Sequence, residues 1–315
     1  MKRYQKLTKR DKLSLLADIA DGLRPFNANA ETIVRELMGD SDPQVRAEAV
    51  TCLWDYPDAK WIEPLTAKAR TDANLDVRTR AISALGRYVY EGAEHYFDGE
   101  YQPDETDEKD MEFSESDFHR VMEFLFNLAH DDDLSVEERR YAIEALAFLE
   151  DPETESLIDW AYSQTDTRYK VSALFAMGRN GNLRWSEIIM AELHSANRDV
   201  QFEAVRAAGE LGLHEATDDL IRLARGRGIN KSLRLRAIYS LGEAGDERAY
   251  PVLEELMRAK DRDVREAARE AAEEWLMMTA VEDMEAGEEI GDLDLEEDLY
   301  GKDIWMTGDY VFSKN

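Results

Sequence analysis

Apolar residues recur along this chain at the spacing of amphipathic helices, and one such pattern returns through most of the sequence. In the stretch 74–88, positions 0, 4 and 8 counted from Val77 are apolar and fall on one stripe of a helix. Related stretches give the same stripe, with position 0 at Val45, Val77, Glu138, Tyr169, Val200, Leu233 and Val264. Successive copies start 31 to 33 residues apart, except for one interval of 61 residues. This fixed period predicts a protein built from stacked repeats.

The columns of the repeat hold small residues. Position 4 is alanine in every copy, at Ala49, Ala81, Ala142, Ala173, Ala204, Ala237 and Ala268. Position 9 is glycine in four copies, at Gly86, Gly178, Gly209 and Gly242. Alanine side chains allow two helices to approach closely, and we expect the glycines to end or bend their helices.

A second amphipathic segment lies between successive copies, and no alternating strand pattern competes with it. Examples are the segments 59–69, 155–164, 186–195, 216–226 and 249–259. Each unit is therefore predicted to be a helix, a turn and a helix, and such units bury their apolar faces by stacking. We predict an all-α fold, an α-solenoid of about seven to eight helical hairpins that curves as a right-handed superhelix around a concave groove.

The repeat motif Asp-x-x-Val-Arg-x-x-Ala-x-x-x-Leu-Gly resembles that of the HEAT-repeat family, in particular the short HEAT-like repeats of phycobilin lyases. Its first copy is Asp42, Val45, Arg46, Ala49 and Leu53, and the resemblance covers roughly residues 30–277. It implies that the Val-Arg helix lines the concave side. It also implies that the arginine and the preceding aspartate tie neighbouring units together, which assigns structural roles to Asp42, Arg46, Asp76, Arg78, Arg139, Asp199, Arg234, Asp263 and Arg265. Lys170 and Gln201 replace the arginine in two copies, where we expect weaker ties.

We divide the chain into three parts. Residues 1–29 form a basic N-terminal segment with a capping helix, and residues 30–278 form the solenoid, which should end in a helix at 263–278. An acidic insertion at 91–118 accounts for the long interval between two copies. Residues 279–315 form an acidic C-terminal tail that ends in an aromatic segment.

The groove should be lined by the positions of the inner helices that do not face the core, namely 2, 3, 6 and 10. In the middle of the solenoid these positions carry arginines and aromatic residues, types that lead among binding hot spots. The candidate partner-binding residues are Arg80, Arg87, Arg140, Tyr141, Phe148, Phe175, Arg179, Phe202, Arg206, Arg236 and Tyr239. In a second interpretation the phenylalanines pack between units, and the arginines pair with Glu144, Glu203 and Glu210 on the same helices.

The net charge of −30 opposes binding to nucleic acid or to an anionic membrane, and favours a basic partner. Much of this charge is local. The insertion 91–118 has twelve acidic residues and one lysine, and the segment 282–299 has ten acidic residues and no base. Such segments are usually solvated and mobile.

The end of the tail differs from a purely solubilising segment because it contains Trp305, Tyr310 and Phe312. We hypothesise that this aromatic end is a peptide ligand that folds back to the groove and competes with external partners. Self-association through the tail or through the solenoid ends stays open.

The sequence contains no catalytic constellation. Its five histidines lack metal-binding spacing, and Cys52, the single cysteine, falls in the core pattern. Ser135 followed by Glu138 three residues later predicts a helix capping box. We expect no cofactor. The chain has no apolar signal region and no 18-residue apolar run, so we expect a cytoplasmic protein.

Three functions are compatible with these features. The first is a non-catalytic scaffold or adaptor that binds a protein or peptide along the concave groove, regulated by its own acidic tail. The resemblance implies a second, a bilin lyase or chromophore-chaperone subunit. The third is nucleic-acid binding, as in HEAT-like DNA glycosylases, which the overall charge opposes.

Overall fold

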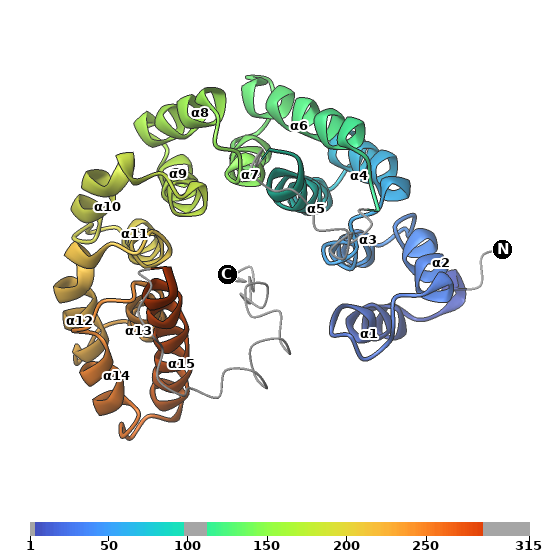
Figure 1. The fold of residues 1–315 in the computed structure, drawn as a ribbon. Helices are drawn as coiled ribbons and strands as arrows, with labels where there is room; N and C mark the ends of the chain where they lie inside the picture. The colour runs from blue at the N-terminus through green and yellow to red at the C-terminus, as the bar shows by residue number, and fades with distance from the viewer. Residues whose placement is uncertain (1–3, 98–111, 286–315) are drawn as a thin grey trace.

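The computed structural model describes residues 4–97 and 112–285, and it shows an arc made of two rows of helices (Figure 1). The outer row contains α2 (Ala28–Leu37), α4 (Ala59–Thr71), α6 (Glu115–His130), α8 (Pro152–Ser163), α10 (Ser186–Glu192), α12 (Thr217–Arg225) and α14 (Tyr250–Leu256). The inner row contains α1 (Lys9–Ala20), α3 (Pro43–Thr51), α5 (Leu75–Gly92), α7 (Val136–Leu146), α9 (Thr167–Asn180), α11 (Arg198–Glu210), α13 (Lys231–Glu243) and α15 (Arg262–Glu285). In this part of the chain all regular structure is helical, which confirms the predicted all-α solenoid.

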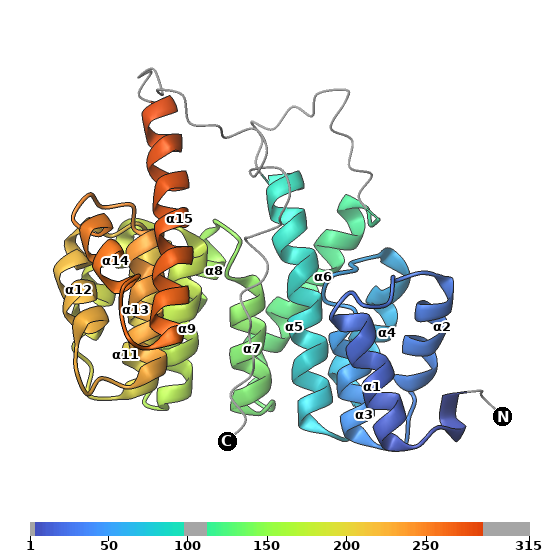
Figure 2. The same cartoon turned by 90° about the horizontal axis from the view of Figure 1, so that it is seen from below.

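Each outer helix pairs with the inner helix that follows it, so the described residues form a row of stacked hairpins preceded by α1. The Val-Arg helices are the inner ones, as the family resemblance implied, and they run parallel to one another (Figure 2). Short helices complete the chain: η1 (Tyr4–Lys6), the π-helix η2 (Ala93–Phe97), η3 (Leu183–Trp185) and η4 (His214–Ala216).

The inner helices begin where they do because position −3 of every repeat supplies a capping side chain. This column reads Asp42, Asn74, Ser135, Asp166, Asn197, Asn230 and Asp261. Each of these side chains accepts a hydrogen bond from a backbone N–H in the first turn of its helix. At Ser135 the contact is reciprocal, since Glu138 accepts from the Ser135 backbone, and the predicted capping box is confirmed.

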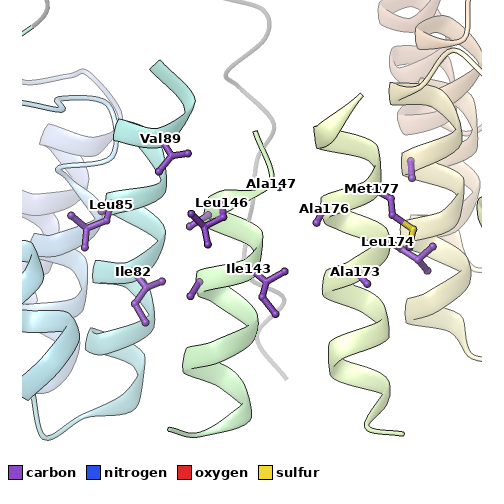
Figure 3. Close-up of a cluster of buried hydrophobic side chains, with 14 of the residues drawn as sticks. Ile82, Leu85, Val89, Ile143, Leu146, Ala147, Ala173, Leu174, Ala176 and Met177 are labelled. Atoms are coloured by element: carbon purple, nitrogen blue, oxygen red, sulfur yellow. The ribbon is translucent and has the colours of Figure 1, made fainter. Parts of the chain in front are cut away.

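The alanine column packs at the centre of the stack. All seven alanines at position 4 are fully buried, and Figure 3 shows how neighbouring inner helices share one core. Val89 of α5 points to the side of α7 and Leu146 of α7 points to the side of α5, whereas Ile143 points from α7 toward α9. The buried apolar residues of the described chain form one continuous cluster from α1 to α15.

The expectation that the position 9 glycines end their helices is wrong for Gly86, while Gly178, Gly209 and Gly242 lie one or two residues before the ends of α9, α11 and α13. Gly86 lies inside α5, and a Cβ there would approach the Cβ of Ala145 on α7 to 2.8 Å. A Cβ on Gly242 would lie 2.3 Å from the Ala271 carbonyl oxygen on α15. These glycines therefore allow adjacent inner helices to touch. Chain reversal uses other glycines, three positions later, at Gly181, Gly212 and Gly245, whose φ angles are positive.

The arginine column makes two kinds of contact. Arg46 and Arg78 reach the next unit, as the family resemblance implied, whereas Arg139, Arg234 and Arg265 donate to backbone carbonyls of their own hairpins. Arg46 donates two hydrogen bonds to the Asp72 carboxylate, at 2.7 and 2.8 Å, and Arg78 donates one to Glu138 at 2.6 Å. The replacements still make contacts of these two kinds, because Lys170 pairs with Glu192 at 2.9 Å and Gln201 donates to the Leu193 carbonyl at 2.8 Å.

The aspartates assigned to the same role differ from one another. Asp42 caps its own helix and also pairs with Lys9 at 2.8 Å. Asp263 accepts from Lys231 of the preceding unit, whereas Asp76 contacts Arg80 on its own helix. The position −3 residue, rather than a position −1 aspartate, is therefore the constant feature of the repeat.

The two ends of the acidic insertion pack against the core, whereas a solvated segment was expected there. Phe113 and Phe118 are buried, and Tyr96 donates a hydrogen bond to the Phe113 carbonyl at 2.9 Å. The backbone N–H of Ala59 also donates to the Glu112 carbonyl. Residues 98–111, the centre of the insertion, lie outside the described residues. At the C-terminal end, α15 continues beyond the expected 263–278 to Glu285.

We predict that Gly242→Ala destabilises the fold by about 2–3 kcal/mol, because the new methyl group meets backbone atoms that cannot move independently. Helix propensity alone would favour alanine by about 1 kcal/mol. Gly178→Ala is the matched control, since the atom nearest its Cβ belongs to the Glu210 side chain and the nearest backbone atom, Ala207 Cα, is 3.0 Å away. Urea unfolding should show a smaller loss in the free energy of unfolding for Gly178→Ala than for Gly242→Ala. A Gly242→Ala variant that is more stable than wild type would contradict the close approach of α13 and α15.

We further predict that Asp72→Asn lowers the free energy of unfolding at pH 7 by about 2 kcal/mol, because Arg46 loses a charged partner. Burial alone would raise the pKa of Asp72, but hydrogen bonds from Arg46 and Lys68 and from the Asn74 backbone hold it below its ordinary value. The carboxylate therefore stabilises the fold above the unfolded pKa of about 4, and this contribution is lost as the pH falls toward the folded pKa.

The difference between wild type and Asp72→Asn should thus shrink in acid, as measured by urea unfolding between pH 7 and pH 3. The exposed Asp76 pairs with Arg80, and Asp76→Asn should change stability by less than about 0.5 kcal/mol. A difference for Asp72→Asn that stays constant over this pH range would rule out the charge-based explanation.

Candidate interaction surface on the concave wall

The open side of the inner helices forms the concave wall, which we define by positions 2, 3, 6 and 10 of the seven units. Outer helices cover the back of each inner helix, and neighbouring inner helices cover its flanks (Figure 1). The predicted groove residues all come from these positions, and most of them are partly exposed. The structure thus places the whole candidate set on one wall.

At the N-terminal side of the wall, two arginines of α5 are held by ion pairs. Arg80 donates to Thr51 on α3 at 2.8 Å and lies 3.4 Å from the Glu48 carboxylate. Arg87 pairs with Glu91 at 2.8 Å and stacks on Tyr90, whose ring meets Phe148 of α7 edge-on at 4.9 Å.

In the middle of the wall, Arg140 of α7 joins two helices. Its guanidinium pairs with Glu137 and Glu144 and stacks on the Tyr141 ring at 4.3 Å. Glu144 in turn accepts a hydrogen bond from Ser172 on α9. Burial raises the pKa of Glu144, against the opposing effect of Arg140, and burial also raises the pKa of Tyr141 to about 12.

The next unit repeats this arrangement around Phe175. Arg206 of α11 stacks on that ring at 4.2 Å and pairs with Glu203 and Glu210, at 2.7 and 2.9 Å. Arg179 shares Glu210 at 3.2 Å and lies 5.9 Å from the same ring. Phenylalanine, arginine and glutamate thereby form one connected group across α9 and α11.

The C-terminal side of the wall is the most acidic. Arg236 pairs with Glu243 on α13, and the Tyr239 hydroxyl donates to Glu270 on α15 at 2.8 Å. Burial and this bond raise the pKa of Tyr239 to about 12. Burial, together with repulsion from Glu243, raises the pKa of Glu274.

The second interpretation describes Arg140 and Arg206, which pair with Glu144, Glu203 and Glu210 on their own helices. Arg179 instead pairs with Glu210 of the neighbouring inner helix. Arg206 is only 4 % exposed, so it holds the wall together and offers little surface to a partner. Phe148, Phe175 and Phe202 are half-buried, each leaving part of its surface open. Trp305, Tyr310 and Phe312 lie outside the described residues.

Sequence reasoning missed two features of the wall. Tyr90, at position 13, lies beside the aromatic residues of the wall because α5 continues to Gly92, beyond the end of the repeat motif. The helical pattern of residues 74–92 could have predicted this longer helix. The second feature is the balance of charge. The wall positions carry six arginines, Arg80, Arg87, Arg140, Arg179, Arg206 and Arg236, and nine carboxylates, Glu48, Asp55, Glu144, Glu203, Glu210, Glu243, Glu266, Glu270 and Glu274.

Other candidate chemistry was also located. Cys52 is buried, its thiol donates to the Leu16 carbonyl at 3.3 Å, and burial raises its pKa to about 12. Across residues 4–97 and 112–285, no three His, Cys, Asp or Glu side chains gather in a way that could hold a metal ion. Nor does any helix in this part of the chain have the length and apolar character needed to cross a membrane.

Comparison with known proteins agrees with the architecture. The sequence profile of HEAT repeats matches residues 30–94 and 186–273. No curated protein has a significantly similar sequence. Among solved structures, the CpcE–CpcF complex of phycocyanin lyase from a Nostoc species has a TM-score of 0.52 and 17 % identity, over 83 % of this chain and 97 % of that one.

Two further structures are more distant. Yeast importin-β (Kap95p) has a TM-score of 0.49 and 13 % identity, over 86 % of this chain and 39 % of that one. Human deoxyhypusine hydroxylase in complex with glycerol has a TM-score of 0.37 and 16 % identity, over 85 % and 96 % of the two chains. At these identities the likeness concerns the fold alone. The repeated motif and the stacked hairpins agree with the matched profile, which identifies residues 30–94 and 186–273 as HEAT repeats.

Proposed function

We propose that this chain is a non-catalytic interaction scaffold that binds a protein or peptide along its concave wall, and that the bound segment is basic. The single observation that carries the proposal is the composition of the wall: half-exposed aromatic rings stand among carboxylates that outnumber the guanidiniums. Arginine or lysine side chains of a partner would meet both carboxylates and ring faces there.

The internal contacts of the wall favour such binding. The rings of Tyr141 and Phe175 are already held by stacked guanidiniums, so little side-chain entropy is lost when a partner contacts them. The excess of negative charge is greatest on α15, where Glu266, Glu270 and Glu274 follow one another on the wall. Phosphates would be repelled by the same carboxylates, which is why we favour a peptide over a nucleic acid.

Regulation by the acidic tail belongs to the same proposal. An aromatic segment tethered to the end of α15 would compete with an external peptide at a high effective concentration. This element depends on residues outside the described part of the chain and rests on their sequence only.

The test is a random-peptide display library panned over the immobilised full chain, followed by affinity measurements on the recovered peptides. We predict that these peptides carry net positive charge and that Glu270→Lys weakens their binding about five- to tenfold, because an attraction becomes a repulsion. Glu254 is exposed on outer helix α14 of the same hairpin, and Glu254→Lys should leave the affinity within twofold. Recovery of neutral or acidic peptides, or equal losses in the two variants, would refute a basic ligand on this wall.

A further inference from the structure

A second charged surface lies on the edge of the solenoid where the last inner helices begin. The loops before α11, α13 and α15 are brought side by side there, because the inner helices run parallel (Figure 2). The Lys231 ammonium contacts Asp261 and Asp263 of the next unit, at 3.4 and 2.5 Å. His194 lies 3.4 Å from the Asp219 carboxylate of the following outer helix.

Four cations on these loops form no ion pair with any other described residue. We call this set the basic edge, and it consists of Arg198, Arg227, Arg258 and Lys260. All four side chains are exposed. Most cations of the solenoid are paired, so a group of unpaired ones on adjacent loops is unusual in a chain of net charge −30.

The acidic residues near the basic edge are mostly occupied by other cations. Asp261 and Asp263 are held by Lys231, as described above. Glu255 pairs with Arg225, and Asp219 pairs with Arg222. Glu266 lies 3.1 Å from Arg262. Of the acidic side chains on these loops, Asp199 alone has no ion pair within the described part of the chain.

The helix ends add to the positive potential of this edge. α11, α13 and α15 all point their N-termini toward it, and the positive end of a helix dipole attracts anions. Two of the three capping residues, Asn197 and Asn230, are neutral, and α13 has no acidic residue in its first turn. In the N-terminal half, the aspartates at the same edge are mostly paired with cations, namely Asp40, Asp42, Asp72, Asp132 and Asp166.

We propose that the basic edge binds an extended acidic segment of a partner protein, with a carboxylate at about every third residue. Packed helices lie about 8–10 Å apart, and three residues of an extended chain span about 10 Å, so successive carboxylates meet successive loops. A short peptide contacts the patch alone. A long polyanion such as a nucleic acid would also meet the negative charge of the rest of the molecule. This surface is separate from the concave wall.

The experiment measures fluorescence anisotropy of a labelled (Glu-Gly-Ser)4 peptide with the full chain, beside the matched peptide (Gln-Gly-Ser)4. The glutamate peptide should bind at 50 mM salt and much more weakly at 300 mM, and the glutamine peptide should not bind. Arg227→Glu/Arg258→Glu should weaken binding at least tenfold. Lys6→Glu/Arg10→Glu makes the same change in net charge at exposed positions of the N-terminal unit and should weaken binding less than threefold.

Absence of binding, or equal weakening by the two double variants, would overturn the proposal. Sedimentation of the free chain provides a further test. If Arg227→Glu/Arg258→Glu abolishes self-association without altering peptide binding, the edge holds an acidic segment of another copy and the proposed partner is wrong. The Glu270→Lys variant should bind the acidic peptide with the affinity of the wild type. Failure of the basic-edge proposal can therefore be distinguished from failure of the concave-wall proposal.

Discussion

The close approach of successive inner helices is the constraint on which the rest of this structure depends. A single hairpin cannot bury its apolar face, so each unit relies on the next one. Fully buried alanines at position 4 and glycines at position 9 remove the side-chain bulk that would separate the helices. At Gly209 a Cβ would meet the Ser240 Cα at 2.7 Å, so the backbones themselves are in contact. Packing this close makes the stack one continuous core.

The same close approach shapes the polar side of the inner helices. When neighbouring helices touch, side chains at positions 2, 3, 6 and 10 of adjacent units fall within hydrogen-bond distance of one another. Arg140 therefore reaches Ser172, and Arg179 reaches Glu210, across unit boundaries. Groups that would be free on an isolated helix become a connected network of charges and rings, which orders the surface that we propose as the partner site.

The two proposed surfaces follow from different properties of a solenoid. The concave wall repeats with the units, so small changes at equivalent positions alter its charge from one end to the other. The edge consists of loops and helix ends, where the repeat tolerates variation as long as a capping residue is kept. Arg227 and Arg258 occupy equivalent positions of adjacent loops, whereas the equivalent residue before α11 is His194. One scaffold can therefore carry an acidic wall and a basic edge.

The sequence by itself determined the architecture, because the information is local and repeated. The alanine column, the period of 31 to 33 residues and the Ser135 capping box each depend on neighbouring residues, and each is present in the structure. The sequence also placed the candidate wall residues on one face. It could not decide the role of Gly86 or Gly242, because a helix-ending glycine and a helix-contacting glycine look alike until the neighbouring helix is in place.

Only the tertiary structure decided which charged side chains are buried in ion pairs and which stay exposed to a partner. Arg206 and Arg227 are equally basic in the sequence, yet Arg206 is buried between two glutamates and Arg227 is exposed without an ion pair among the described residues. The difference depends on contacts across α9, α11 and the loops before α13 and α15. The two glutamates lie on the same helix as Arg206, but its burial also depends on Phe175 of the neighbouring inner helix, about thirty positions away, which only stacking brings into contact.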